Sequence, residues 1–211
     1  MSDQTPHNLT IEGRPEWPLF VFAHGAGAPM DSDFMNRMTE LLLERRVAVA
    51  RFEFPYMAER RENGKKRPPN GQKQLLDCWR EVFAECKADR KLIIGGKSMG
   101  GRMASMIADE VGAAGLVCLG YPFHAPGKPE KTRTEHLQAL QTPTVIIQGT
   151  RDAMGNQEEV THYSLSDAIE LFWLEDGNHD LKPRIKSGFS HDQHLQLAAD
   201  RMAAFCSEVD A

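Results

Sequence analysis

The stretch that decides the fold is residues 91–101, KLIIGGKSMGG. A short apolar run leads into glycines that flank Ser98 in the pattern G-x-S-x-G, and a helical apolar pattern follows. In such a turn the central residue is strained, and its neighbours two positions away must lack Cβ so that strand and helix can approach. The stretch therefore predicts a strand, turn and helix with the Ser98 hydroxyl lifted clear. A tight glycine-rich turn that only holds an anion is the alternative.

Five further apolar runs resemble the one before Ser98, and helical patterns lie between them. Runs that are apolar on both faces are typical of strands buried in a parallel sheet. The predicted strands are 19–25, 47–54, 91–96, 115–120, 144–149 and 169–177. The predicted amphipathic helices, by the spacing of their apolar residues, are 33–45, 71–89, 99–110 and 191–207.

The alternation of strands and helices predicts an α/β fold. We expect a mostly parallel sheet of about six to seven strands with helices on both faces, because parallel strands need crossover connections. One domain is expected over residues 1–211, with its core at about 15–207. Ligands of such sheets bind beyond the carboxyl ends of the strands. The irregular stretches 55–73 and 121–135 follow strands and so are expected at that edge.

Composition narrows the class of protein. The net charge of −5, with mixed signs, disfavours a nucleic-acid surface, and no apolar run reaches the ~18 residues of a membrane span. The four cysteines form no C-x-x-C pair, which predicts free thiols in a reducing cytoplasm. Histidine spacing indicates no metal, and no cofactor is expected. A small molecule is the expected partner, and the sequence indicates no oligomeric state.

A serine hydroxyl needs a histidine to take its proton and a carboxylate to orient that histidine. Asp152 and His179 each come just after a predicted strand, and they follow Ser98 in the order Ser, acid, His. Asp176 and Asp180 are alternative acids, but both lie so near His179 in the chain that reaching the far ring nitrogen is hard. We predict a triad of Ser98, His179 and Asp152.

The oxyanion of acyl transfer needs two preorganised donors. One is the backbone N–H after the nucleophile, which belongs to Met99. The second is expected from the small-residue loop after the first central strand, and we choose Ala26 ahead of Gly25. His24 at the start of that loop is expected to support it structurally.

Candidate substrate contacts come from the loops at the same edge. They are Lys97 beside the serine, Tyr56 and Met57 from one loop, and Tyr121, Phe123 and His124 from another. Local packing explains the aromatic residues equally well.

Residues 57–73 carry an excess of positive charge, with six Lys and Arg residues against two acidic residues, Glu59 and Glu62. The segment is either a solvated face or a mobile flap that steers acidic substrates to the site. Arg51 and Arg102 are further candidate anion contacts, or partners of carboxylates within the fold.

Four motifs, HGAGA (24–28), GGKSMGGR (95–102), QGTRD (148–152) and DGNHDL (176–181), resemble the α/β-hydrolase superfamily. Within it the chain resembles the dienelactone-hydrolase-like branch, and in particular the small capless KANSL/TEX-type predicted hydrolases, over roughly 15–207. RFEFPYM (51–57) and LGYPFHAPGKPE (119–130) are similar to stretches of that group. The resemblance implies the α/β-hydrolase fold without a cap, the same triad and an intracellular ester-type hydrolase. Dienelactone hydrolase itself uses cysteine where this chain has Ser98, so no lactone substrate is implied.

The expected activity is serine hydrolysis of a small carboxylic ester or thioester through an acyl-enzyme on Ser98. Whether the substrate is anionic stays open. A peptidase or an acyltransferase uses the same triad. A non-catalytic interaction module on the same fold is the alternative of a different class. Such a module is expected to lose a triad member or an elbow glycine, and this chain keeps them all.

Overall fold

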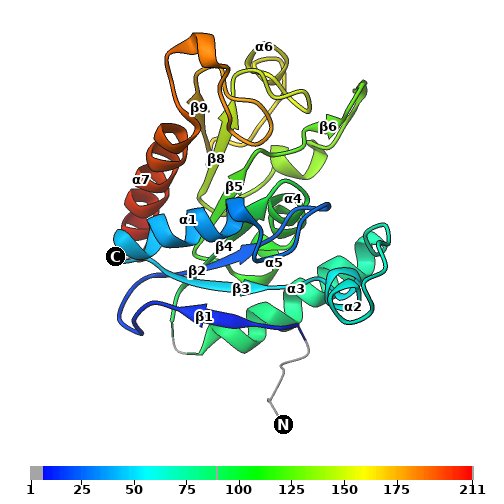
Figure 1. Ribbon diagram of the computed structural model, residues 1–211, viewed down its shortest axis with the longest axis vertical. Helices are drawn as coiled ribbons and strands as arrows, with labels where there is room; N and C mark the ends of the chain where they lie inside the picture. The colour runs from blue at the N-terminus through cyan, green and yellow to red at the C-terminus, as the bar shows by residue number, and fades with distance from the viewer. Residues whose placement is uncertain (1–6, 89, 211) are drawn as a thin grey trace.

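The computed structural model describes residues 7–88 and 90–210. Its main sheet consists of β1 (Thr10–Glu12), β2 (Leu19–Ala23), β3 (Ala48–Phe52), β4 (Leu92–Lys97), β5 (Gly115–Leu119), β8 (Thr144–Gly149) and β9 (Ile169–Leu174). The strand order is β1-β3-β2-β4-β5-β8-β9, and only β1 pairs antiparallel among these seven described strands (Figure 1). The predicted mostly parallel sheet is confirmed.

Helices cover both faces of the sheet (Figure 1). On one face lie α1 (Asp33–Glu44) and α7 (His191–Asp210), and on the other α3 (Gln72–Lys87), α4 (Met99–Ser105) and α5 (Ala108–Val111). The shorter elements are α2 (Pro55–Asn63), η1 (Glu135–Gln138), α6 (Gln157–Val160), η2 (Ile185–Ser187) and a hairpin of β6 (His124–Ala125) with β7 (Lys128–Thr132).

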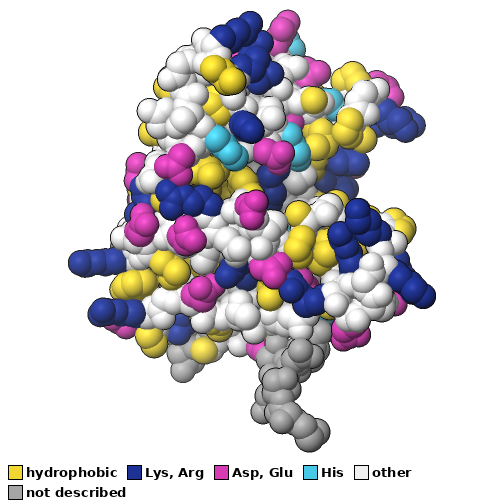
Figure 2. All heavy atoms as spheres, in the orientation of Figure 1, with side chains coloured by type: hydrophobic (Ala, Val, Ile, Leu, Met, Phe, Trp, Pro, Cys, Tyr) yellow, Lys and Arg dark blue, Asp and Glu magenta, His cyan; other side chains and the backbone are white. Residues whose placement is uncertain are grey.

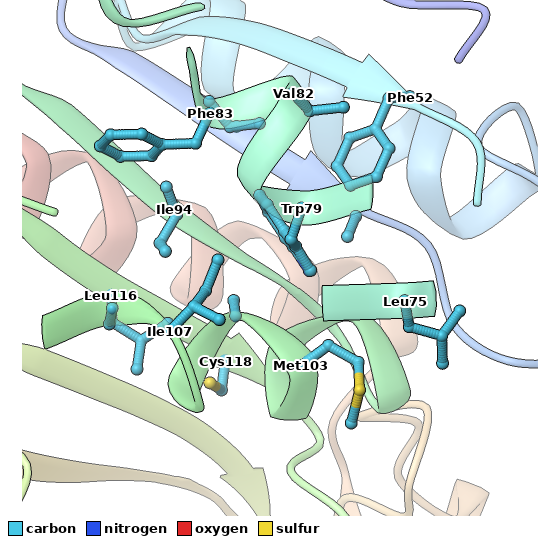
Figure 3. Close-up of a cluster of buried hydrophobic side chains, with 14 of the residues drawn as sticks. Phe52, Leu75, Trp79, Val82, Phe83, Ile94, Met103, Ile107, Leu116 and Cys118 are labelled. Atoms are coloured by element: carbon cyan, nitrogen blue, oxygen red, sulfur yellow. The ribbon is translucent and has the colours of Figure 1, made fainter. Parts of the chain in front are cut away.

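The central strands are apolar throughout because the sheet has a core on each side. Alternate side chains of a strand point to opposite faces. Val21 therefore enters the core under α3 and α4, whereas Phe20 and Phe22 enter the core under α1 and α7. In the first core the fully buried Trp79 packs edge-on against Phe52 with ring centroids 4.8 Å apart (Figure 3). Both cores pack against the strands whose carboxyl ends carry the site, and so fix the position of those ends.

Several predicted boundaries were wrong. The short strand β1, which pairs with β3, was not predicted, because three residues are too few for a periodic signal. The stretch 55–73, predicted irregular, contains α2, which has Pro55 in its first turn and is followed by Gly64 with φ 70° as its C-cap. The stretch 121–135 contains the β6–β7 hairpin. The helix predicted over 99–110 divides into α4 and α5.

The four cysteines are free and buried, and burial raises the pKa of Cys86 to about 11 and that of Cys78 to about 12. In the described part of the chain, no helix has the length and apolar character needed to cross a membrane.

Candidate active site

Ser98 sits in the sharp turn between β4 and α4, with φ 51° and ψ −115°. Few L-residues adopt this left-handed region, so the turn is strained. A Cβ on Gly96 would lie 2.6 Å from the carbonyl oxygen of Ala23, and one on Gly100 would lie 2.6 Å from that of His24. Both positions therefore require glycine, and the turn has the geometry that the G-x-S-x-G spacing predicts.

Three strand ends bring the predicted triad together. Ser98 follows β4, Asp152 follows β8 and His179 follows β9, all at the carboxyl edge of the sheet. His179 Nε2 lies 2.8 Å from Ser98 Oγ, and its Nδ1 lies 2.8 Å from Asp152 Oδ2. A carboxylate only accepts, so Nδ1 carries the proton and Nε2 is free to accept from the Ser98 hydroxyl. The ring is therefore oriented as a general base toward Ser98.

The Asp152 carboxylate is fully buried, with 0% of the residue exposed. Its Oδ1 accepts from the Met154 N–H at 2.8 Å, and its Oδ2 also accepts from Gln148 Nε2 at 2.9 Å. A buried charge is tolerated when such donors surround it. Sequence reasoning missed Gln148, which also accepts from the Tyr121 N–H at 2.7 Å. The available signal was one polar side chain in the otherwise apolar end of TVIIQG.

The two alternative acids are engaged elsewhere. Asp176 pairs with Arg184 and, at 2.9 Å, with Arg151, and the hydrogen bond from Arg184 lowers the pKa of its carboxyl. Asp180 is largely exposed and lies 3.2 Å from Lys97 Nζ. Within residues 7–88 and 90–210 neither carboxylate bonds to the His179 ring. Asp152 is the carboxylate on that ring.

The predicted oxyanion donors lie beside the serine with their N–H groups unused. In the part of the chain that the structure describes, the N–H groups of Met99, Ala26 and Gly25 donate no hydrogen bond. Ala26 lines both cavities that adjoin Ser98, whereas Gly25 lines one. This placement favours Ala26 as the second donor. His24 supports the loop: its Nε2 accepts from the Phe54 N–H at 3.1 Å, and burial lowers its pKa.

Ser98 lies between two cavities. The first measures about 330 Å³ and is lined by His179, Lys97 and Phe34 among others. The second measures about 380 Å³ and is lined by residues of α3, α4 and the segment before α3, together with Arg133. Met99 lines the second cavity only, and His179 the first only. A substrate carbonyl held at Ser98 can therefore extend one substituent into each.

Lys97 holds the histidine loop as well as lining the first cavity. Its Nζ donates to the carbonyl oxygen of His179 at 2.7 Å and sits 5.6 Å from the centroid of the Phe34 ring. Burial lowers the pKa of this ammonium, and Asp180 opposes the shift.

The other candidate substrate contacts need correction, because their side chains point into the core. Tyr56, Met57, Tyr121, Phe123 and His124 are all buried, and none lines either cavity beside Ser98. The Tyr56 hydroxyl donates to the Ala26 carbonyl at 2.9 Å, and that of Tyr121 donates to a backbone carbonyl at 2.9 Å. A place after a strand does not decide which way a side chain points. These residues shape the loops rather than the cavity walls.

The basic segment 57–73 contains a helix, and its excess of positive charge is smaller in the structure than its sequence indicates. Lys and Arg side chains cluster over α2 and its surroundings in Figure 2. Arg61 bonds to Asp31 and Glu53, however, and Arg67 and Lys73 also have acidic partners. Much of the predicted local charge is thus neutralised by neighbouring carboxylates.

Residues 16–207 match the family described as alpha/beta hydrolase domain. The chain belongs to this family. Three solved structures share the fold. Est1E from Butyrivibrio proteoclasticus, with ferulic acid bound, is 16% identical, with a TM-score of 0.71 over 95% of this chain and 94% of that one. Dienelactone hydrolase from Anabaena variabilis is 19% identical, with a TM-score of 0.67 over 91% and 89%. A serine hydrolase without a lid from Xanthomonas campestris is 16% identical, with a TM-score of 0.62 over 92% and 88%.

These likenesses identify the architecture as the α/β-hydrolase fold. The short β6–β7 hairpin follows β5, where lid domains enter this fold, and residues 7–88 and 90–210 form no cap domain over the strand ends. Membership of the family supports a hydrolase in general, and the named neighbours are esterases and related hydrolases.

Proposed function

We propose that the protein is a serine hydrolase that cleaves a small carboxylic ester or thioester through an acyl-enzyme on Ser98. The observation that carries this proposal is the continuous hydrogen-bonded series from Asp152 through His179 to Ser98, with both links at 2.8 Å. The unused N–H groups of Met99 and Ala26 support it.

The chemistry follows from the geometry. The Ser98 hydroxyl attacks the carbonyl carbon while its proton passes to His179 Nε2, and the imidazolium is stabilised by Asp152. The carbonyl oxygen becomes an oxyanion that accepts from Met99 and Ala26, each donor contributing about 3 kcal/mol to transition-state stabilisation. His179 then gives its proton to the leaving alkoxide or thiolate. In the second half of the reaction His179 takes a proton from water, which attacks the acyl carbonyl carbon. The bond to Ser98 Oγ then breaks, His179 returns the proton to Ser98, and the acid is released.

Two finer assignments belong to the same proposal. Kinship with the capless KANSL/TEX-type hydrolases rests on the stretches 51–57 and 119–130, and a cytoplasmic location rests on the unpaired cysteines. A non-catalytic interaction module on this fold has no need of a complete triad with two free oxyanion donors, which is why hydrolysis is preferred.

A fluorophosphonate probe tests the proposal directly, because it reacts only with an activated serine. Wild type should be labelled and Ser98→Ala should not. Ser105→Ala is the matched control: Ser105 also lies 2.8 Å from a histidine nitrogen, that of His136, but lines neither cavity. It should be labelled like wild type. Equal labelling of wild type and Ser98→Ala would remove Ser98 from the mechanism.

Turnover of a panel of esters and thioesters then reports the preferred leaving group. Ser98→Ala and Ser105→Ala are measured beside wild type. The kcat of Ser98→Ala should fall by at least about 10⁴-fold.

A further inference from the structure

We propose that the second cavity binds a carboxylate at the far end of the substrate's acyl group, through the guanidinium groups of Arg102 and Arg133. The inference rests on the proposed function and names the substrate class: half-esters of small dicarboxylic acids.

The first observation is that neither guanidinium bonds to a carboxylate of the residues that the structure describes. Arg102 makes one side-chain hydrogen bond, from Nη2 to Gln72 Oε1 at 3.4 Å, and its Nε is buried without a partner. The Arg133 side chain makes no hydrogen bond or ion pair within the described residues. Arg51 differs: its Nε is also unpartnered, but its Nη2 lies 2.6 Å from Glu12. The sequence offered Arg51 and Arg102 as candidate anion contacts, and of these two only Arg51 pairs with a carboxylate of the described residues.

The second observation is the make-up of the cavity around these two arginines. Among the described residues that line it there is no Asp or Glu. Leu75 of α3 and Met103 of α4, both labelled in Figure 3, contribute apolar surface. Figure 2 shows the molecule hollowed between the β6–β7 hairpin and α2, with Lys and Arg side chains in the hollow. The volume, about 380 Å³, suits a short aliphatic chain with one charged end.

The two like charges favour an anion between them. Burial lowers the pKa of Arg102; Tyr121 opposes the shift, and the positive charge of the neighbouring Arg133 adds to it. Guanidinium stays charged in proteins, so the repulsion is relieved by a bound anion rather than by loss of a proton. Its planar fork of donors matches the two oxygens of a carboxylate.

The position of His179 decides which part of the substrate enters this cavity. The general acid must reach the leaving oxygen, and His179 lines the first cavity and not the second. The leaving group therefore lies on the side of the first cavity, beside Phe34 and Lys97. The acyl group extends the other way, past Met99, toward Arg102.

The test compares mono-4-nitrophenyl glutarate with its methyl ester, which has the same acyl chain without the charge. Wild type should show the higher kcat/KM on the anionic ester. Arg102→Met and Arg133→Met should each lower the ratio of the two kcat/KM values by about 10- to 100-fold, as expected for a charged hydrogen bond. Arg102→Lys should restore part of the ratio. Arg80→Met is the matched control, because Arg80 pairs with Glu110 outside both cavities, and it should keep the wild-type ratio.

A second pair of esters places the charge on the leaving group: 4-carboxyphenyl valerate and its methyl ester. Arg102→Met should not lower the ratio for this pair. A loss here instead of on the glutarate pair would overturn the assignment of the cavity to the acyl group. A wild-type glutarate ratio that neither arginine variant changes, in protein that the fluorophosphonate labels, would overturn the carboxylate site and leave the serine hydrolase intact.

Binding of free glutarate, the expected product, gives a readout without turnover. Calorimetry on Ser98→Ala should detect glutarate, and adding Arg102→Met to that variant should abolish the signal. Absence of binding in Ser98→Ala at millimolar glutarate would overturn the carboxylate site. Failure of the fluorophosphonate to label wild type would instead overturn the proposed function.

Discussion

The protein contains two serine–histidine pairs with the same contact distance and the same ring nitrogen, but with different surroundings. Ser98 to His179 and Ser105 to His136 are both 2.8 Å contacts between a hydroxyl oxygen and a ring Nε2. The Ser105 hydroxyl, however, donates to the carbonyl oxygen of Arg102 at 2.8 Å. His136 must therefore donate to Ser105, and it cannot take the proton of that hydroxyl.

The backbone and the third partner complete the contrast. Ser98 has φ 51° in a strained turn that opens on two cavities, whereas Ser105 closes the regular helix α4. His179 is oriented by Asp152, whereas within residues 7–88 and 90–210 no carboxylate bonds to the His136 ring. A short contact thus does not make a nucleophile; the direction of the hydrogen bond, the orienting acid and access to substrate do.

Removing the orienting acid should have the largest effect. In Asp152→Asn the amide can donate to the ring and favour the wrong tautomer, so we expect kcat to fall by about 10⁴-fold. Asp176→Asn is the control, because Asp176 pairs with Arg184 and Arg151 instead. It should retain turnover within a few-fold. Turnover of a 4-nitrophenyl ester measures both, and a loss below tenfold in Asp152→Asn would contradict the role given to that carboxylate.

A change in the turn itself should act on stability. A Cβ on Gly100 would lie 2.6 Å from one backbone oxygen and 2.7 Å from another, so the strand and helix must move apart. We expect Gly100→Ala to lower the free energy of unfolding by about 1–3 kcal/mol, as overpacking does. Gly27→Ala meets no atom within 4 Å and should change it little. Urea denaturation measures the stability of both variants. If Gly100→Ala were as stable as wild type, the turn would accommodate a Cβ at position 100 and the prediction would be wrong.

The smallest effect concerns the pH dependence of stability. Burial lowers the pKa of His136, and Arg102 adds to the shift. As the pH falls below about 6.5, the unfolded chain takes up a proton that the folded chain resists, so the free energy of unfolding decreases. Burial lowers the pKa of His24 in the same direction. His136→Gln should therefore reduce, without abolishing, the loss of stability between pH 7.5 and 5. An unchanged slope would contradict the assigned shift.

Much of the site could be predicted from the sequence, because each of its residues is placed by a short stretch of chain around it. The turn around Ser98 needs glycines at fixed offsets, and parallel strands deliver their carboxyl ends to one edge of the sheet. Asp152 and His179 could therefore be placed beside Ser98 from strand ends alone. The six parallel strands and the helices on both faces were also predicted, from the periodicity of the apolar residues. The order of the strands in the sheet was not.

Contacts between segments distant in sequence were decided only by the tertiary structure. Gln148 accepts from the N–H of Tyr121, 27 residues earlier in the chain. Arg133 and Arg102 line one cavity although they come from different elements of the fold. Whether Tyr121 points into the cavity or into the core likewise depends on neighbours in space. The sequence by itself determined which chemical groups stand at the strand ends, because backbone geometry is local. Which side chains surround the substrate, and with what charge, depended on how the loops fold over that edge.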